Sequence, residues 1–280
     1  MNTALYCVIG NPVEHSRSPW IHARFAQLTG QPIEYGRRLA QLDGFAQSLR
    51  ALRAQDDGRA RGCNVTVPFK FEAAQLAQRL SARAQLAQAA NTLRFDTDGI
   101  YGDNTDGIGL VNDITAHAGI ALAGRDVLLI GAGGAAAGAL GPLLEAGARR
   151  VVIANRTPQK AAALAQRHAA LAQMRQVQLQ AQPLDGITGA FAIVINATAA
   201  SLCGAAIPVR ADVLAPGALA LDMMYGPAAH GFMTWAREHG AAPRDGLGML
   251  VEQAAQSFLL WRGVRPPTAQ VLSELRAIVG

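Results

Sequence analysis

The sequence predicts an α/β protein built from two domains. Short apolar runs alternate with amphipathic helical patterns along most of the chain, as in sheets whose strands are connected by helices. Two of these runs, 127–130 and 151–154, flank a glycine-rich turn and a helix of small residues. The length of 280 residues suits one large domain or two of ordinary size, and half of the residues are hydrophobic, enough for a substantial core.

The first hundred residues predict alternating strands and helices. An apolar strand at 5–9 stops at Gly10-Asn11-Pro12. Ser18 followed by Pro19 predicts a helix with serine as its N-cap, and Gly30 predicts its end. Further strands are expected at 33–39, 62–67 and 91–95, with a return strand that ends at 102. Helices are expected at 44–53 and 82–89, with another that begins near 69, and a turn is expected at 56–58.

A second series of elements follows residue 103. The expected helices are 108–118, one after the glycine-rich turn, 158–170, 229–239, 247–261 and 268–278, and the expected strands include 177–181, 191–195 and 218–222. We place the domain boundary near Asp106. The predicted substrate domain is 1–106, completed by the helices of 246–280, and the predicted nucleotide domain is 107–245.

The charge pattern argues against a nucleic-acid-binding protein. The chain has 25 lysines and arginines against 20 acidic residues, a net charge of +5, but the basic residues are scattered and form no recognisable motif. Only two of them are lysines, Lys70 and Lys160. Where charge alone suffices the chain uses arginine, so a surviving lysine marks a place where an ammonium able to lose its proton is useful; chance survival is the alternative.

We expect no membrane span and no metal site. The charge-free runs 127–144 and 187–209 hold glycines, prolines and polar residues, and are better explained as buried strands joined to helices or loops. The N-terminus lacks the basic region and long apolar run of a signal peptide, so a cytoplasmic protein is expected. The cysteines show no CxxC or zinc spacing, which favours a reduced compartment; they are Cys7, Cys63 and Cys203.

The glycine-rich turn predicts a dinucleotide site. The spacing Gly131-x-Gly133-x-x-Ala136 fits the G-x-G-x-x-G/A pattern between a strand and a helix. Gly131 permits the tight turn, and Gly133 with Gly134 lets a pyrophosphate approach the backbone. The N–H groups at the start of the following helix attract that anion. A purely structural turn is the alternative, but both flanking strands lie at the expected distances.

The end of the second strand favours NADP over NAD. NAD-binding domains usually place Asp or Glu there to bind the ribose 2′-hydroxyl. This chain has Asn155-Arg156-Thr157, with Lys160 one turn further. Two cations and a hydroxyl suit a 2′-phosphate, and no carboxylate is present to repel it.

Eight motifs, in order, make the chain resemble the shikimate dehydrogenase family from end to end. They are HSRSP at 15–19, NVTVPFK at 64–70, ANTL at 90–93, DNTDG at 103–107, GAGGAA at 131–136, NRT at 155–157, INAT at 195–198 and DGLGMLVEQ at 245–253. The resemblance implies a Rossmann-type NADP domain and a substrate domain. The implied reaction is hydride transfer between NADPH and the C3 carbonyl of 3-dehydroshikimate, which gives shikimate in the pathway to the aromatic amino acids.

The resemblance implies a catalytic pair, Lys70 and Asp106. A lysine ammonium can protonate the alkoxide that hydride transfer forms, and the neutral amine can accept the proton in reverse. Asp106 can orient both the lysine and the substrate hydroxyl. Taken alone, Asp106 is better explained as a helix cap and Lys70 as a solvated first-turn lysine, and it is the matched motifs that favour catalysis.

Further contacts are implied by the same match. Those to the substrate carboxylate are Ser16, Ser18 and Tyr225, and those to its hydroxyls are Thr66, Asn91, Asp106 and Gln253. Short polar side chains suit such a ligand, because an unmatched buried polar group costs about 1–3 kcal/mol. The implied NADP contacts are Gly131, Ala132, Gly133, Gly134, Ala135, Asn155, Arg156, Thr157, Lys160, Met223 and Gly246. A helix cap is the alternative for Ser18, a surface glutamine for Gln253 and a core methionine for Met223.

The chain departs from the family pattern at three places. Ala82 stands where a glutamate is common, Ala199-Ala200 replace part of a serine-rich segment, and the segment after Tyr225 reads GPAAHGF. These departures concern the nicotinamide loop and cofactor affinity.

Two alternatives remain open at this point. One is a quinate/shikimate dehydrogenase that uses NAD, against which Asn-Arg-Thr and the pair Ser16 and Ser18 argue. The other is a noncatalytic NADP(H)-sensing module, against which the retention of Lys70 and Asp106 argues. The expected partner is a small-molecule substrate, with no nucleic acid and no membrane, in a monomer or a homodimer.

Overall fold

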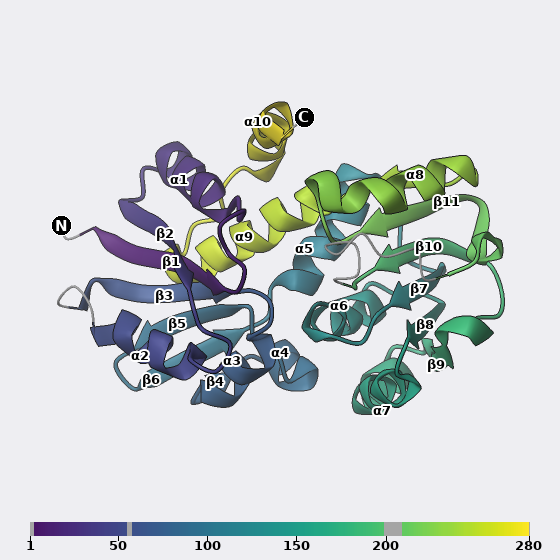
Figure 1. The fold of residues 1–280 in the computed structure, drawn as a ribbon, viewed down its shortest axis with the longest axis horizontal. Coiled ribbons are helices and arrows are strands. Elements are labelled where there is room, and N and C mark those ends of the chain that lie inside the picture. Colours follow the sequence, from purple (N-terminus) through teal and green to yellow (C-terminus); the bar gives the residue numbers. More distant parts are fainter. Residues whose placement is uncertain (1–2, 55–57, 199–208, 280) are drawn as a thin grey trace. The chain divides into compact units, whose positions relative to one another are not determined.

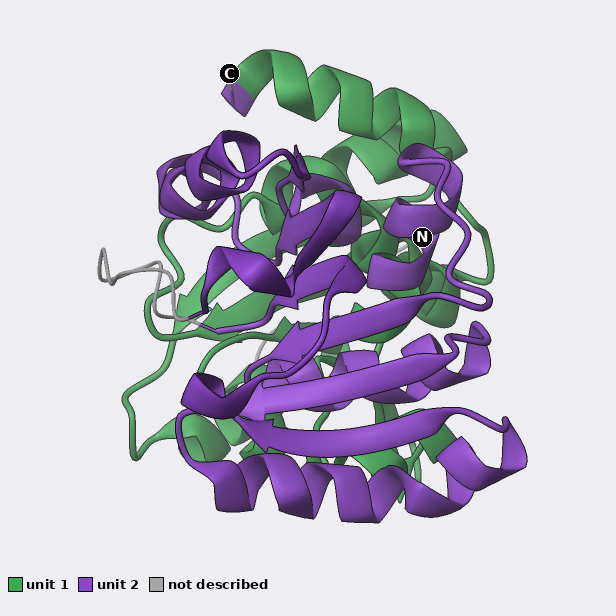
Figure 2. Cartoon of the chain, turned by 90° about the vertical axis from the view of Figure 1, so that its right-hand side faces the viewer, with its two compact units in different colours: residues 1–109, 250–278 green, residues 110–249, 279–280 purple. Residues whose placement is uncertain are grey.

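The computed structural model describes residues 3–54, 58–198 and 209–279 (Figure 1). The chain forms two compact units, coloured separately in Figure 2. The first unit comprises residues 1–109 and 250–278, and the second comprises 110–249 with 279–280. This division agrees with the predicted two-domain α/β class.

The first unit is built on a six-stranded mixed sheet in the order β2-β1-β3-β5-β6-β4. β1 pairs in parallel with β2 and β3, β5 runs antiparallel to β3 and β6, and β4 is parallel to β6. The strands are β1 (Ala4–Gly10), β2 (Ile33–Leu39), β3 (Ala60–Val65), β4 (Arg79–Leu80), β5 (Thr92–Asp96) and β6 (Gly99–Asp103).

The two faces of this sheet differ because side chains alternate along each strand. On β3, Cys63 and Val65 belong to a hydrophobic cluster with Phe45 of helix α2 (Phe45–Ala54) and Ala73 of helix α3 (Lys70–Leu76). The intervening Asn64 points to the opposite face, where it bonds to helix α9 (Leu247–Arg262). Helix α1 (Ser18–Thr29) lies on that face too, and helix α4 (Ala82–Ala87) follows the edge strand β4.

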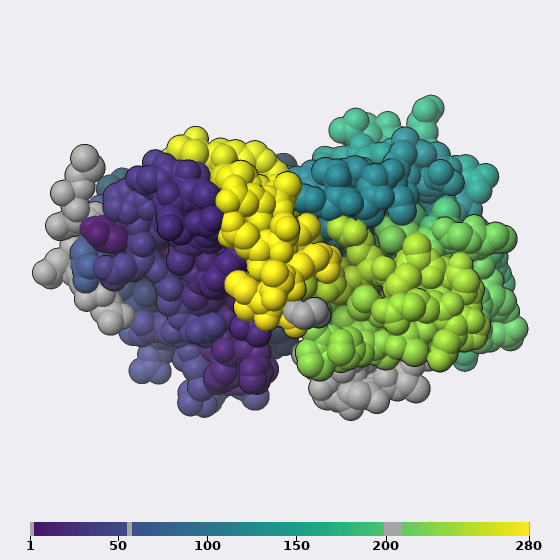
Figure 3. All heavy atoms as spheres, turned by 90° about the horizontal axis from the view of Figure 1, so that it is seen from above, coloured from purple at the N-terminus to yellow at the C-terminus, as the bar shows by residue number. Residues whose placement is uncertain are grey.

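The C-terminal helix α10 (Thr268–Val279) lies against α1 in the same unit, as the adjoining yellow and purple atoms of Figure 3 show. Arg24 of α1 forms a two-pronged ion pair with Glu274 of α10, with an Nε–Oε2 distance of 2.6 Å. The N-terminal and C-terminal parts of the chain therefore share one folded unit.

The second unit is a doubly wound sheet of six parallel strands in the order β12-β11-β10-β7-β8-β9. Its strand order reverses between β7 and β10, which is the topological switch point where such sheets bind ligands. The strands are β7 (Asp126–Ile130), β8 (Arg150–Asn155), β9 (Gln178–Pro183), β10 (Phe191–Asn196), β11 (Leu214–Asp222) and β12 (Ala242–Arg244).

Helices cover both faces of this sheet. Helix α8 (His230–Glu238) packs on one face, where Phe232 joins a cluster of strand residues. Helices α6 (Gly134–Glu145) and α7 (Pro158–Met174) lie on the other face (Figure 1). Helix α5 (Asp106–Asn112) continues into a π-helical turn, Asp113–His117, and 3₁₀ turns occupy Leu184–Gly186, Ala211–Val213 and Gly226–Ala229.

A buried ion pair holds the π-helical turn to β12 in the second unit. Asp113 is fully buried, and both nitrogens of the Arg244 guanidinium fork bond to its carboxylate, with an Nε–Oδ2 distance of 2.8 Å. Gly248 packs so closely on this carboxylate that an added Cβ would lie 1.7 Å from Oδ1. A glycine is therefore required at the start of α9.

Most predicted elements are confirmed, with a few corrections. Ser18 is the first residue of α1, Arg17 occupies the cap position, and no side chain caps the helix, so the predicted serine cap is wrong. Val67 lies beyond the end of β3, and the short strands β4 and β12 were not predicted. The predicted turn at 56–58 falls mainly outside the described residues. None of the described helices has the length and apolar character needed to cross a membrane.

Candidate active site

A lysine and an aspartate form a close, nearly buried pair in the first unit. The Nζ of Lys70 lies 2.6 Å from the Oδ2 of Asp106, and their side chains are 14% and 6% exposed. Charge-assisted hydrogen bonds of this kind are short and stronger than neutral ones. The structure thus brings together the two residues predicted to be catalytic.

The local fold places Lys70 at the edge of the sheet. β3 ends at Val65, and the next residues turn into α3 with a bond from Phe69 N–H to the Thr66 carbonyl (3.1 Å). Phe69 is buried and its ring stacks on Phe45 at a centroid distance of 4.9 Å. The Lys70 carbonyl accepts a hydrogen bond from Ala90 N–H (2.8 Å), so the start of α3 is anchored to the residues that precede Asn91.

The second oxygen of Asp106 is held by Asn91. The amide Nδ2 of Asn91 donates to Oδ1 at 2.8 Å, and the backbone N–H of Asp106 donates to Asn104 Oδ1 at 3.2 Å. Gln253 of α9 joins the group, since its Oε1 accepts from Asn91 Nδ2 at 3.2 Å. Four of the predicted site residues, Lys70, Asp106, Asn91 and Gln253, therefore form one connected cluster.

The segment before Asp106 is fixed by an ion pair that sequence reasoning missed. Asp103 is buried, and Arg83 of α4 donates to both of its oxygens, with an Nε–Oδ1 distance of 2.8 Å. Ser81 donates to the same carboxylate, whose Oδ1 also accepts the N–H of Asn104 at 2.7 Å. Ala82, one of the three departures noted in the sequence, begins α4 beside Ser81 and Arg83.

Three more predicted substrate residues lie at the carboxyl edge of the same sheet. Ser16 and Ser18 follow β1, and the Ser16 hydroxyl accepts the Ser18 N–H at 3.3 Å. Arg37 of β2 holds their loop by donating to the Ser16 carbonyl at 2.6 Å. Thr66 follows β3, and its methyl carbon lies 2.2 Å from where a Cβ on Gly10 would be, so any side chain at position 10 would collide with Thr66.

The glycine-rich turn of the second unit has the form that a pyrophosphate requires. Gly131 has φ of +114°, and an added Cβ would lie 3.1 Å from the Ala197 carbonyl oxygen. Gly133 is the N-cap of α6, and nothing lies within 4 Å of where its Cβ would be. The backbone at Gly133 can therefore be approached closely by a phosphate at the N-terminus of a twelve-residue helix.

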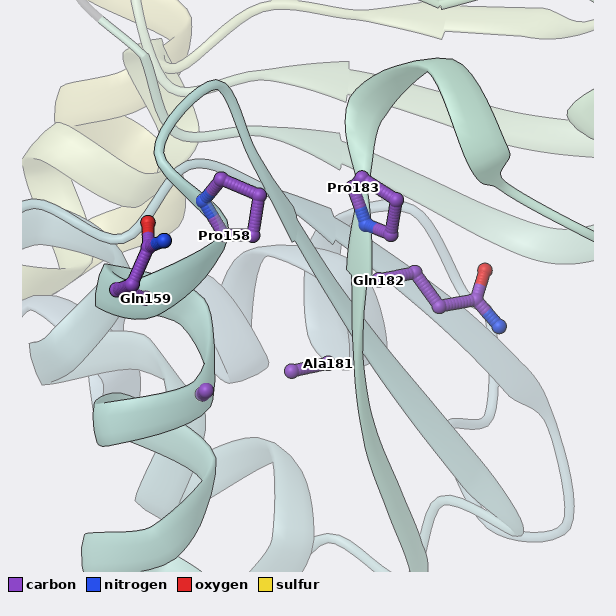
Figure 4. Close-up of a pocket in the computed structure, with 6 residues that line it drawn as sticks. Pro158, Gln159, Ala181, Gln182 and Pro183 are labelled. Atoms are coloured by element: carbon purple, nitrogen blue, oxygen red, sulfur yellow. The ribbon is translucent and has the colours of Figure 1, made fainter.

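The predicted 2′-phosphate residues follow β8. Asn155 ends the strand and donates to the Thr157 carbonyl at 2.9 Å, which shapes the turn into α7. Arg156, Thr157 and Lys160 are exposed. The start of α7 and the end of β9 also line a cavity of about 260 Å³ (Figure 4), bounded by Pro158, Gln159, Ala162, Ala181, Gln182 and Pro183. The predicted cofactor residues are not among those that line it.

The ends of β10 and β11 are joined by side-chain hydrogen bonds. Asn196 Nδ2 donates to Asp222 Oδ2 at 2.9 Å, and Met224 N–H donates to Asp222 Oδ1 at 2.8 Å. Met223 is buried, and an added Cβ on Gly246 would lie 2.3 Å from its carbonyl oxygen. Tyr225, half-buried, precedes the 3₁₀ turn in this second unit, and its predicted contact with substrate stays a prediction. Ala199 and Ala200 lie outside the described residues.

These features define a class of protein, a nicotinamide-nucleotide oxidoreductase. The second unit provides a dinucleotide-binding sheet, and the first provides a lysine–aspartate pair suited to proton transfer. Among the described residues, no group of three or more His, Cys, Asp and Glu side chains could hold a metal ion.

Comparison with known proteins identifies the family. Residues 8–93 match the model of the shikimate dehydrogenase substrate binding domain, 113–204 match shikimate / quinate 5-dehydrogenase, and 246–276 match the shikimate 5′-dehydrogenase C-terminal domain. The chain therefore belongs to the shikimate dehydrogenase family, as its motifs predicted.

Individual relatives agree with this assignment. Shikimate dehydrogenase (NADP(+)) of Methylibium petroleiphilum is 66% identical over 277 residues, which cover 98% of this chain and 94% of the relative. Shikimate 5-dehydrogenase from Thermus thermophilus, solved in complex with NADP(H) and shikimate, is 30% identical with a TM-score of 0.82, over 98% of this chain and 99% of that one. An Ael1 enzyme from Pseudomonas putida is 46% identical with a TM-score of 0.87, over 98% of both chains.

Proposed function

We propose that the chain catalyses the reversible, NADPH-dependent reduction of 3-dehydroshikimate to shikimate in aromatic amino-acid biosynthesis, with Lys70 and Asp106 as its acid–base pair. The observation that carries the proposal is the 2.6 Å contact between these two side chains, at a sheet edge in the first unit. Family membership, with relatives of about two thirds identity named shikimate dehydrogenase (NADP(+)), supports the reaction.

The pair's geometry suits proton transfer to a carbonyl oxygen. When bound, NADPH supplies the hydride. One N–H of the Lys70 ammonium is engaged by Asp106, which leaves two to face the substrate oxygen. Lys70 donates a proton to that oxygen as it gains negative charge, and in the reverse direction its neutral amine accepts the proton. Asp106 fixes the direction of the ammonium and stabilises its charge.

The polar residues around the pair suit a small hydroxylated carboxylate. Asn91 and Gln253 lie within the cluster and Thr66 lies after β3, so we assign them to the substrate hydroxyls. Ser16 and Ser18, after β1, are assigned to the carboxylate together with Tyr225. Each polar group of the ligand then has a hydrogen-bond partner on the protein. An analogue that lacks one of these polar groups leaves the protein side chain that binds it unpaired, at a cost of about 1–3 kcal/mol.

We assign NADP to the second unit. The glycine-rich turn at 131–135, which is open at Gly133, suits the pyrophosphate, and the exposed side chains of Arg156, Thr157 and Lys160, with Asn155, suit the 2′-phosphate. Met223 and Gly246 are assigned to the nicotinamide end. We further propose that residues 1–106 with 246–280 bind the substrate and that residues 107–245 bind NADP. A cytoplasmic location is part of the same proposal.

A rate matrix tests the function. Purified protein is assayed at 340 nm with shikimate or quinate, each with NADP or NAD. We expect a rise in absorbance that is fastest with shikimate and NADP. A fast reaction of quinate with NAD would favour the quinate/shikimate alternative. A flat trace in all four arms, from a protein that still binds NADP and beside a working control enzyme, would favour a sensing module and refute the proposal.

A further inference from the structure

A cluster of buried polar side chains lies behind Asn91 in the first unit. It consists of Asn64, Thr92, Thr105 and Ser257, none more than 6% exposed, and is called the Thr92 cluster below. Asn64 and Thr92 are partners on the adjacent strands β3 and β5, and Ser257 of α9 bonds to both. Buried polar groups weaken a core unless they are paired, so a set that contacts the active site requires an explanation.

Hydrogen bonding fixes the orientation of the Asn91 amide. Its Oδ1 lies 2.8 Å from the backbone N–H of Thr105, a group that can only donate. The amide nitrogen must then face the other way, toward the Asp106 carboxylate at 2.8 Å. Gln253 agrees with this orientation, because its own Nε2 donates to the Leu250 carbonyl at 2.8 Å and its Oε1 is left facing Asn91.

The hydrogen bonds of the Thr92 cluster have a defined donor-to-acceptor order, which begins at Tyr35. The Tyr35 hydroxyl donates to Asn64 Oδ1 at 2.7 Å, and burial raises the pKa of Tyr35, so the donor keeps its proton. Asn64 Nδ2 can then only donate, and it lies 3.2 Å from the Asn91 carbonyl, 2.9 Å from Ser257 Oγ and 3.0 Å from Thr92 Oγ1.

Thr92 continues this donor-to-acceptor order to the active-site residue Asn91. Its hydroxyl donates to Asn91 Oδ1 at 2.9 Å, and because it has one hydrogen it must accept at its other contacts. Ser257 Oγ lies 2.7 Å from it, closer than the 3.1 Å to the Gln253 carbonyl that Ser257 could bond to instead. One path of donors therefore leads from Tyr35 through Asn64 and Thr92 to Asn91, whose amide nitrogen donates to Asp106. In a buried chain each such bond polarises the next and strengthens the last one.

We propose that Thr92 is a positioning residue for catalysis: its hydroxyl holds the Asn91 amide so that Asn91 in turn holds the Asp106 carboxylate in line with Lys70. The proposal rests on the proposed function, because it assumes that Lys70 and Asp106 carry the proton transfer. Thr92 itself is fully buried and acts through Asn91.

The test is a double-mutant cycle measured by kcat at saturating shikimate and NADP. Thr92→Val removes the hydroxyl and keeps the shape, and we expect kcat to fall about tenfold, with Thr92→Ser restoring it to within twofold. Ser257→Ala, which leaves Asn64 as a donor to Thr92, should lower kcat about threefold. Thr29→Val removes a threonine hydroxyl bonded to the Phe25 carbonyl elsewhere in this unit and should change nothing.

The decisive arm repeats Thr92→Val in an Asp106→Asn background, assayed at high enzyme concentration. If Thr92 acts through Asp106, the tenfold effect shrinks below twofold there, whereas a general loss of structure would lower kcat equally in both backgrounds. Equal losses, or a Thr92→Val enzyme within twofold of the parent, would overturn the inference. If Asp106→Asn alone kept full kcat, the proposed catalytic pair would be wrong instead.

Discussion

Replacing Arg156 by glutamine tests how the chain selects NADP. Arg156 follows β8 and is exposed, and Lys160 lies on the first turn of α7. In the proposed function both cations bind the 2′-phosphate, the one group that NAD lacks. The substitution keeps a polar but shorter side chain and removes the charge and the guanidinium fork, so its effect should be confined to NADP.

The exposure of Arg156 sets the size of the effect. A hydrogen bond to a charged group contributes about 1.5–3 kcal/mol, and solvent screening at an exposed site favours the lower end. A loss of about 1.4 kcal/mol corresponds to a tenfold weaker affinity. We therefore expect Arg156→Gln to raise the KM for NADP about tenfold and to leave the KM for NAD within twofold. The difference between parent and variant should shrink as salt is added.

The assay is initial rate at 340 nm with saturating shikimate and varied NADP or NAD. Arg175→Gln is the matched control, because Arg175 is an exposed arginine just past the other end of α7. It should change neither constant. Equal increases in KM for both cofactors would show that Arg156 acts on the shared part of the dinucleotide, and an unchanged KM for NADP would refute the assignment.

Two predictions concern stability. His22 is fully buried and its ring stacks on Tyr35, and burial, opposed in part by Asn64, lowers its pKa to about 3. In the unfolded chain His22 takes up a proton near pH 6.5, whereas in the folded protein it stays neutral down to about pH 3. The free energy of unfolding is therefore unaffected by His22 above pH 6.5 and decreases as the pH falls from 6.5 toward 3. Between pH 7.5 and 5, urea unfolding should show the parent losing about 2 kcal/mol more than His22→Phe; equal losses would contradict this. Arg244→Met leaves Asp113 buried without its partner and should cost about 3–5 kcal/mol, whereas Arg149→Met, which breaks a pair whose arginine is 67% exposed, should cost under about 1 kcal/mol. Similar losses of stability in Arg244→Met and Arg149→Met would refute the argument that burial of the remaining carboxylate sets the loss.

The fold could be predicted because its signals are local. The apolar runs 127–130 and 151–154 and the glycines between them lie within one short stretch, and they became β7, the turn and β8. The two- and three-residue strands β4 and β12 have no run long enough to detect. The Ser18 cap was wrong because a Ser-Pro pair does not say which residue begins the helix.

The sequence predicted only those site residues that lie in recognisable motifs. Lys70 and Asp106 are 36 residues apart, and no spacing rule joins them; the family resemblance named the pair and the structure showed it in contact. The Thr92 cluster was missed because it depends on strand register and on a helix more than 150 residues away. A usable signal existed: alternation along β3 puts Asn64 on the face opposite Cys63 and Val65, where a buried polar side chain is unusual.

The chain's two lysines allow the most direct test of the central claim that the Lys70–Asp106 pair transfers the proton. With both substrates saturating, Lys70→Met should lower kcat about 10²–10⁴-fold while NADP binding, measured by fluorescence titration, stays unchanged. Lys160→Met, the matched control, should raise the KM for NADP and leave kcat within twofold. A Lys70→Met enzyme that keeps the parent's kcat would contradict the account, whatever its affinity for NADP.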